Sequence, residues 1–251
     1  MLQDFLDFAR LNAISATVLE LTGSTNDAAS DPACRHGDIV VALEQSCGRG
    51  QRGNSWSSER GRNLTFSIVL EPENFAAERQ FMLSKIVALS IVEVLAKFGV
   101  EARIKWPNDI YAGSRKIAGV LIENSVCGAQ LTRSIVGIGL NVNQTAFDPA
   151  LPNPTSVALE TGREADLGHL LKELYITLMS MLRRGGGRSV DRLYLEKLYL
   201  RGVPHRFTAS GRSFEGVIRG VGDYGELLVE QEGGATDSYL FKEIEFERGA
   251  P

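Results

Sequence analysis

The sequence is poor in the residues that build disulfide frameworks and metal centres. It has 251 residues but only three cysteines and three histidines. The cysteines are odd in number and none is spaced as Cys-x-x-Cys, which argues against a disulfide framework and against a zinc site. The histidines are scattered, and each is interpreted as an ordinary surface or capping residue. We therefore expect no metal bound by protein side chains.

An excess of basic residues is also missing. The chain has 27 Lys and Arg against 31 Asp and Glu, which gives a formal net charge of -4. Proteins that bind nucleic acids usually carry a basic excess. We therefore expect no nucleic acid among the partners of this protein.

Long apolar segments are absent as well. No apolar run approaches the length that spans a membrane, and the N-terminal segment MLQDFLDFAR lacks the pattern of a signal peptide. We expect a cytoplasmic protein with no membrane partner. Its 43% hydrophobic content suffices for a substantial core in one or two domains.

What the sequence does have is a concentration of glycine and arginine between Cys47 and Phe66, CGRGQRGNSWSSERGRNLTF. Glycine lets a backbone approach a ligand closely, and the arginine fork suits carboxylate and phosphate groups. The segment therefore predicts a loop that grips an anion near the main chain. The alternative is a plain turn, but guanidinium groups held close together repel each other unless an anion joins them.

The spacing Gly48-x-Gly50-x-x-Gly53 also matches the dinucleotide-binding fingerprint. A strand is expected before it, at 39–44, but the segment after it reads as a turn and then as another strand, at 63–70. Without a helix N-terminus to receive the pyrophosphate, the fingerprint loses its mechanism. We therefore reject that interpretation.

Three further blocks follow the loop: Lys105-Trp-Pro-Asn-Asp109, residues 114–123 (SRKIAGVLIE) and Gly137-Ile-Gly-Leu-Asn-Val-Asn143. With the glycine-arginine loop they stand in the order and spacing of the biotin protein ligases. The chain resembles that family from about Leu21 to Phe246. The four blocks together are very specific, although any one alone would be weak.

The fold class that we expect is α+β. Before residue 201 the pattern alternates between helices and strands, and after residue 202 short strands are separated by glycine turns, which suggests a small barrel. The resemblance implies the same division: a catalytic domain with a mixed sheet and helices at residues 1–201, and an SH3-like β-barrel at 202–251.

The resemblance also implies a two-step reaction. The carboxylate of biotin attacks the α-phosphate of ATP, which gives biotinyl-5′-AMP and pyrophosphate, and a lysine of a biotin carboxyl carrier protein then displaces AMP. Mg²⁺ is expected to come with ATP and to be held mainly by phosphate oxygens. Because the pattern begins near Leu21, the short form without an N-terminal DNA-binding domain is expected. Family members often pair through the sheet edge, so a homodimer is one assembly that the resemblance implies.

The residues that the resemblance assigns fall into three groups. Lys116, Arg49 and Arg52 are the expected catalytic residues, and Lys116 would bridge the biotin carboxylate and the α-phosphate. The expected biotin-binding residues are Ser24, Thr25, Asn26, Gln45, Gly48, Arg49, Lys116 and Gly119. The expected ATP-binding residues are Arg52, Asn54, Trp56, Asn108 and Asn141.

Simpler roles stay open for several of these residues. Lys116 could be a solvated charge at a strand end, Ser24 a helix N-cap and Trp56 a core residue, although polar neighbours favour a half-exposed Trp56 that stacks on adenine. Asp109 is either a structural anchor or a support for a ligand-binding side chain. Gln51 stands where many bacterial members carry arginine, which leaves open how tightly the adenylate is retained.

Three other functions compete with biotin ligation. A lipoate or octanoate ligase or transferase is similar in fold, but the KWPND block and the GRGxxGNxW loop are a biotin-ligase signature. A catalytically silent sensor would be favoured by the loss of Lys116 or the arginines, and these are present. An RNA-binding loop around Trp56 is disfavoured by the acidic composition.

Overall fold

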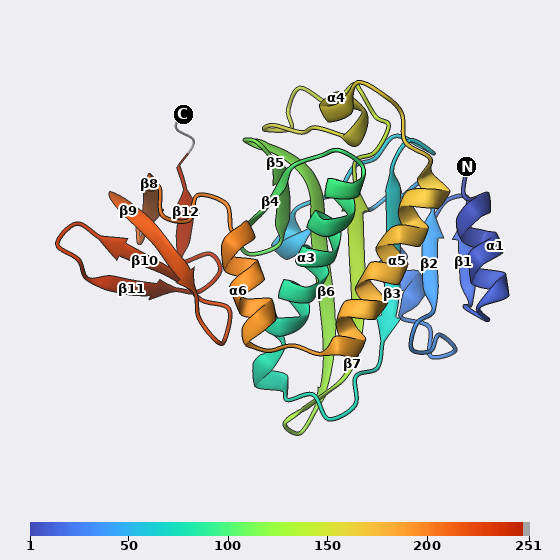
Figure 1. Cartoon of the computed structure of the whole chain (residues 1–251), viewed down its shortest axis with the longest axis horizontal. Helices are drawn as coiled ribbons and strands as arrows, with labels where there is room; N and C mark the ends of the chain where they lie inside the picture. The colour runs from blue at the N-terminus through green and yellow to red at the C-terminus, as the bar shows by residue number, and fades with distance from the viewer. Residues whose placement is uncertain (248–251) are drawn as a thin grey trace.

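The computed structural model describes residues 1–247, and of residue 52 only the main chain. Seven strands form one mixed sheet in the order β1-β2-β3-β7-β6-β5-β4 (Figure 1). β1 and β2 are parallel, and all the other neighbours are antiparallel. The strands are β1 (Ala16–Leu19), β2 (Ile39–Ala42), β3 (Leu64–Leu70), β4 (Ala102–Lys105), β5 (Asp109–Ala112), β6 (Arg115–Cys127) and β7 (Gln130–Leu140). The predicted α+β fold class with a mixed sheet is confirmed.

Two long helices, α3 (Phe81–Lys97) and α5 (Leu167–Arg184), lie in front of this sheet in Figure 1. α1 (Gln3–Leu11) packs against α5, and α6 (Arg188–Lys197) packs against α3. Two short helices, α2 (Thr25–Ala29) and α4 (Val157–Thr161), complete the set. Within residues 1–247 no helix combines the length and the apolarity that a membrane crossing requires.

β3 shows how the sequence separates the two faces of the sheet. Side chains alternate between faces along a strand, and Leu64, Phe66 and Ile68 belong to the main core that contains α3 and α5. Of the intervening residues, Ser67 is hydrogen-bonded to the α2 side chains of Thr25 and Asn26, and Val69 belongs to a second apolar cluster with Ala29. The face away from α3 and α5 is therefore the polar one, and α2 packs on it.

The C-terminal segment forms a second, antiparallel sheet in the order β11-β10-β9-β8-β12. Its strands are β8 (Pro204–Ala209), β9 (Arg212–Val221), β10 (Leu227–Gln231), β11 (Thr236–Tyr239) and β12 (Ile244–Phe246). Phe207, Ile218 and Val229 are fully buried within it. The SH3-like closure of this sheet and the boundary between 201 and 202 stay predictions, and residues 248–251 lie outside the described part.

Candidate active site

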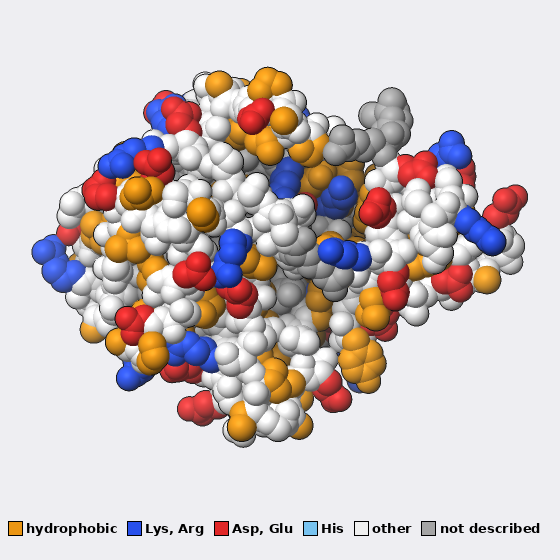
Figure 2. Space-filling model, turned by 180° about the vertical axis from the view of Figure 1, so that it is seen from behind, with side chains coloured by type: hydrophobic (Ala, Val, Ile, Leu, Met, Phe, Trp, Pro, Cys, Tyr) orange, Lys and Arg blue, Asp and Glu red, His pale blue; other side chains and the backbone are white. Residues whose placement is uncertain are grey.

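A cavity of about 270 Å³ opens on the face of the large sheet that α3 and α5 leave uncovered. Its walls come from the start of α2, the loop at 45–56, strands β5, β6 and β7, and residues 241–246 of the C-terminal segment. Figure 2 views the molecule from this side and shows a hollow between the body and the C-terminal part, with Lys and Arg side chains at its edge. The cavity therefore joins all four sequence blocks.

Three glycines make the floor of the cavity. Gly119 of β6 is paired with Gly139 of β7, and Gly137 lies two residues before Gly139 on β7. A β-carbon on Gly139 would lie 2.2 Å from the Trp56 ring, and one on Gly137 would lie 2.3 Å from Asn26 Oδ1. A side chain at these positions would collide with its neighbours, so the floor has to be bare backbone. Gly119 was expected here, whereas the role of Gly137 and Gly139 was not foreseen.

Amide and hydroxyl groups line one end of the cavity. The Ser24 hydroxyl caps α2 by accepting from Asn26 N, as the sequence suggested. Gln45 Oε1 accepts from Thr25 N at 2.8 Å. Ser67 Oγ donates to Asn26 Oδ1 at 2.6 Å and is hydrogen-bonded to the Thr25 hydroxyl at 2.8 Å. This network fixes donors and acceptors for a neutral polar group, and Ser67 is a member that the sequence reasoning missed.

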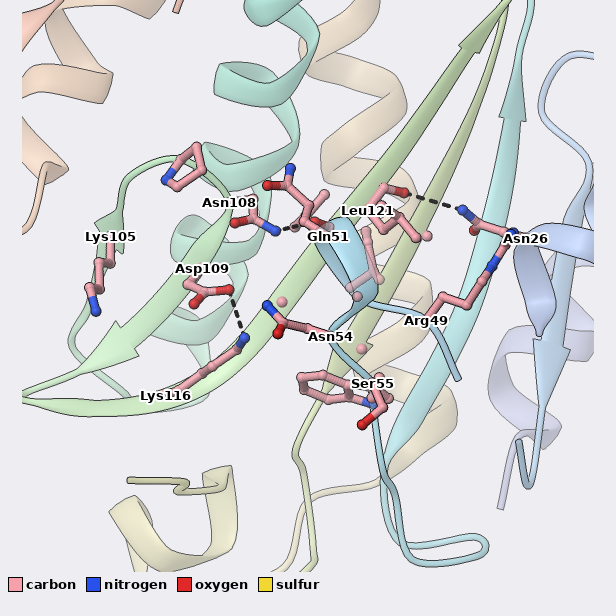
Figure 3. A pocket seen from close by; sticks show the side chains of 18 of the residues that line it. Asn26, Arg49, Gln51, Asn54, Ser55, Lys105, Asn108, Asp109, Lys116 and Leu121 are labelled. Atoms are coloured by element: carbon pink, nitrogen blue, oxygen red, sulfur yellow. Dashed lines mark hydrogen bonds and ion pairs between the residues drawn. The ribbon is translucent and has the colours of Figure 1, made fainter. Parts of the chain in front are cut away.

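A charged pair stands at another part of the cavity. Lys116 Nζ lies 2.7 Å from Asp109 Oδ1, and the two side chains, which point toward each other in Figure 3, are 33% and 24% exposed. β5 and β6 pair antiparallel, with Lys116 opposite Tyr111. Asp109 lies two residues before Tyr111 and so on the same face of β5, which makes Asp109 and Lys116 diagonal neighbours. The ammonium also lies 5.8 Å from the Trp56 ring centroid. The pair gives Asp109 the anchoring contact that one of its two expected roles requires.

Asn108 is held by two hydrogen bonds to one residue of β6. Its Nδ2 donates to Val120 O at 2.7 Å, and its own carbonyl accepts from Val120 N at 3.0 Å. Asn108 directly precedes β5, so these bonds continue the pairing of β5 and β6 beyond the ladder pair of Asp109 and Gly119. The side chain lines the cavity, as Asn54 does.

The glycine-arginine loop folds over the sheet at residues 48–56. Trp56 N donates to Gly48 O at 2.9 Å, and a β-carbon on Gly48 would lie 2.2 Å from Trp56 O. This close approach explains the glycine, although Gly48 is not among the lining residues. A 3₁₀ turn, Gln51–Gly53, occupies the centre of the loop, and no α-helix follows it before β3.

Three side chains of the loop show how it meets the cavity. Arg49 pairs with Asp27 at 2.7 Å and with Glu123 at 3.1 Å. Trp56 is half-buried against Gly139, and its Nε1 has no hydrogen-bond partner among the described residues. Gln51 Oε1 is buried and likewise without a partner in the part of the chain that the structure describes. The expectation for Arg52 concerns a side chain outside the described residues.

Two expected ligand-binding residues in the described part of the chain, Gly48 and Asn141, do not line the cavity. Asn141 is 4% exposed, and its Nδ2 donates to Thr155 O at 2.9 Å. Its Oδ1 is buried with no partner among the described residues. Its expected role in ATP binding stays a prediction.

The C-terminal sheet contributes one wall of the cavity, which the sequence motifs did not predict. Phe241, Ile244, Glu245 and Phe246 line the cavity beside Lys105. The Lys105 ammonium lies 5.1 Å from the Phe246 ring centroid and 4.7 Å from that of Tyr111. The only signal in the sequence was the aromatic content of this segment, which a small core explains equally well.

Residues 1–247 contain no group of three or more His, Cys, Asp or Glu side chains arranged to hold a metal ion. The charged side chains among the described lining residues are Arg49, Lys105, Lys116, Asp109 and Glu245. Asp109 pairs with Lys116, and Arg49 pairs with Asp27 and Glu123 outside the lining. The site is therefore a polar cleft in which the cationic groups of Arg49 and Lys116 are paired with carboxylates and can pair with an entering anion instead.

Residues 18–141 match the model of the biotin/lipoate A/B protein ligase family. The bifunctional ligase/repressor BirA of Escherichia coli K12 is 31% identical to this chain over 233 residues, which are 89% of the chain and 72% of BirA. This chain belongs to that family.

Other relatives are matched by this chain over nearly their full length. The biotin–acetyl-CoA-carboxylase ligase of Paracoccus denitrificans is 31% identical over 229 residues, 86% of this chain and 95% of that protein. Among solved structures, the biotin protein ligase of Aquifex aeolicus in complex with biotin and ATP is similar with a TM-score of 0.79 and 27% identity. That match covers 94% of this chain and 99% of the Aquifex chain. The family predicted from the four sequence blocks is confirmed.

Proposed function

We propose that this chain is a biotin–acetyl-CoA-carboxylase ligase. It would use ATP to convert biotin into biotinyl-5′-AMP and then transfer the biotinyl group to one lysine of a biotin carboxyl carrier protein. The observation that carries the proposal is the single cleft in which a neutral amide and hydroxyl end lies beside the Lys116–Asp109 pair over a glycine floor. The similarity to biotin ligases over nearly the whole chain supports the same conclusion.

The first step brings two anions together. An oxygen of the biotin carboxylate attacks the α-phosphorus, a new phosphorus–oxygen bond forms, and pyrophosphate leaves. We assign Lys116 to hold the carboxylate and the α-phosphate against each other, because its ammonium lies next to the glycine floor. Asp109 holds that ammonium in place before the anions enter. Asn108, Asn54 and Arg52 are proposed for the phosphates, and Trp56 and Asn141 for the nucleoside.

The second step moves the acyl group. A neutral acceptor amine attacks the acyl carbon, the bond from that carbon to the phosphate oxygen breaks, and AMP leaves with its charge still neutralised. The proton that the amine loses passes to solvent. We assign Ser24, Thr25, Asn26 and Gln45 to the ureido ring, Arg49 and Gly48 to the loop over the intermediate, and Gly119 to the backbone along the tail of biotin. Water must be excluded between the two steps, since the mixed anhydride hydrolyses readily.

Several finer points belong to the same proposal. Mg²⁺ would enter with ATP and be held mainly by phosphate oxygens. The protein would work in the cytoplasm, as a monomer or as a homodimer. DNA is not among the proposed partners, because the net charge of -4 offers no basic excess for phosphate contacts.

The test separates biotin from its nearest rival in the family. The protein is incubated with ATP labelled at the α-phosphate and with either biotin or lipoate, and the labelled adenylates are resolved. We expect biotinyl-AMP, and transfer of biotin to a carboxylase carrier domain when that domain is added. Formation of lipoyl-AMP alone would refute the proposal and identify a lipoate ligase.

A further inference from the structure

A buried hydrogen bond joins the KWPND block to the C-terminal sheet. Trp106 Nε1 donates to the carbonyl oxygen of Gly225 at 2.7 Å, between two residues 119 positions apart. Trp106 is 4% exposed, and its ring lies edge-on to Phe241, with centroids 6.1 Å apart. The donor and the acceptor are both removed from water, so the loss of either would leave a buried polar group unsatisfied.

The acceptor belongs to a turn, residues 222–226, which connects β9 to β10. Gly222 N donates to Glu226 O at 2.8 Å, and Glu226 Oε2 accepts from Tyr224 N at 3.0 Å. Gly225 has φ +94°, and a β-carbon there would lie 2.5 Å from the Phe81 ring. The turn is thus wedged between Phe81 of α3 and Trp106, and only glycine fits at its tip.

The donor stands directly before the residues that line the cleft. Trp106 precedes Pro107, Asn108 and Asp109, and Asp109 contacts Lys116 at 2.7 Å. Asn108 is in turn bonded to Val120. A shift of the Trp106 ring therefore moves one end of a short segment whose other end carries the pair at the proposed reaction centre.

We propose that the turn 222–226 positions Asn108 and Asp109 through the Trp106–Gly225 hydrogen bond, which makes Trp106 and Glu226 positioning residues for adenylate formation. This inference rests on the proposed function. It gives the C-terminal sheet a specific part in the first step. Biotin itself is expected to bind through α2 and Gln45, which lie elsewhere, so binding of biotin is expected to change little when the turn is loosened.

Two conservative variants test the proposal from the two sides of the bond. Trp106→Phe removes the donor and keeps an aromatic ring, and Glu226→Ala removes a brace of the turn. In each we expect kcat for biotinyl-AMP formation to fall about fivefold to tenfold, as displacement of catalytic groups predicts, with the Kd of biotin within about twofold. The matched control is Glu232→Ala, the same substitution at an exposed residue of the turn between β10 and β11, which should match wild type.

A double variant tests whether both residues act through one contact. If they do, Trp106→Phe/Glu226→Ala loses no more activity than the stronger single variant. Multiplied losses would show independent effects and overturn the proposal. Equal kcat in wild type and both single variants would overturn it as well, and so would a loss confined to the Kd of biotin.

A spectroscopic measurement keeps the inference separate from the proposed function. The chain has two tryptophans, and Trp106→Phe identifies the indole N–H signal of Trp106 by its disappearance. Glu226→Ala should accelerate hydrogen exchange of that N–H, and Glu232→Ala should not; unchanged exchange in both would refute the coupling. If wild type forms no biotinyl-AMP while the exchange result holds, the proposed function fails and the contact stands.

Discussion

The two sheets contribute to the same cleft in different ways. The large sheet supplies the glycine floor and the Lys116–Asp109 pair, both within the sequence blocks that carry the family resemblance, and the amide end is added by α2 and Gln45 from outside those blocks. The C-terminal sheet supplies an aromatic wall and a turn that presses on Trp106, and it holds none of those blocks. In the proposed function the chemistry is thus assigned to residues of the large sheet, α2 and the loop, and the second sheet is assigned a role through shape. Substitutions in the large sheet and its loop should therefore reduce activity more than substitutions in the C-terminal sheet.

The largest effect should come from Lys116→Ala. Removing the ammonium leaves two anions to approach each other unaided, so we expect kcat for adenylate formation to fall about 100-fold or more. The matched control is Lys97→Ala, which breaks a lysine–carboxylate pair with Glu173 on the helical side, away from the cleft. Near wild-type rates of biotinyl-AMP formation in Lys116→Ala would contradict the assignment.

A smaller effect is expected from Arg49→Gln. The guanidinium is paired with two carboxylates beside the amide end, and in the proposal it helps close the loop over biotin. We expect KM for biotin to rise about tenfold and more free biotinyl-AMP to escape, as a lost charge-assisted contact predicts. Arg60→Gln is the control, because Arg60 also pairs with two carboxylates but lies outside the cleft lining. Equal kinetics in the two variants would reduce the loop to a plain turn.

Two buried tyrosines of the main core differ in whether the hydroxyl has a hydrogen-bond partner. Tyr175 on α5 donates to Gly37 O at 2.8 Å, whereas the Tyr194 hydroxyl on α6 is buried without a partner among the described residues. Tyr175→Phe should therefore lower the free energy of unfolding by about 1 kcal/mol. Tyr194→Phe removes an unsatisfied group and should be neutral or stabilising. Urea denaturation of both variants checks this, and a larger loss for Tyr194→Phe would contradict it.

Tyr194 also makes the stability of the folded protein depend on pH in the alkaline range. Burial raises the pKa of Tyr194 above its ordinary value, so the folded protein favours the neutral phenol. The resulting stability is present below pH of about 10, the ordinary tyrosine value, and is lost as the pH rises toward the folded pKa. Tyr194→Phe should consequently lose less stability than wild type between about pH 9 and 11.

The smallest effect should come from Phe246→Leu in the C-terminal wall. The substitution keeps an apolar side chain but removes the ring that faces the Lys105 ammonium. A contact of this kind is worth about 0.5–1 kcal/mol, so kcat/KM for adenylation should fall about threefold. Phe214→Leu in β9 is the control, since Phe214 does not line the cleft. A loss as large as that of Lys116→Ala would abolish the contrast between the two sheets.

The strength of the local sequence signal decided which helices and strands could be predicted from the sequence. The strands expected at 39–44 and 63–70 correspond to β2 and β3, because each is a short, mostly apolar run bounded by turn residues. α1 and β5 were missed. α1 is short, and β5 begins inside a motif whose proline and polar residues read as a turn.

The candidate site divides in the same way. Most motif residues with described side chains do line one cleft, because the strands that carry them are neighbours in the sheet. The contribution of Ser67 could not be predicted, since a serine in a buried strand looks the same whether or not it bonds to α2. The contact of Trp106 with Gly225 depends on how distant segments pack, and no local pattern records it.

The glycine floor limits how the protein can be altered to accept a different ligand. Gly119, Gly137 and Gly139 already have no side chain, so no substitution at these positions can widen the cleft from below. A programme that seeks variants for bulkier biotin analogues would gain nothing by randomising them. It would have to act instead on side chains that line the amide end of the cleft, such as Thr25 and Gln45, which smaller residues can replace.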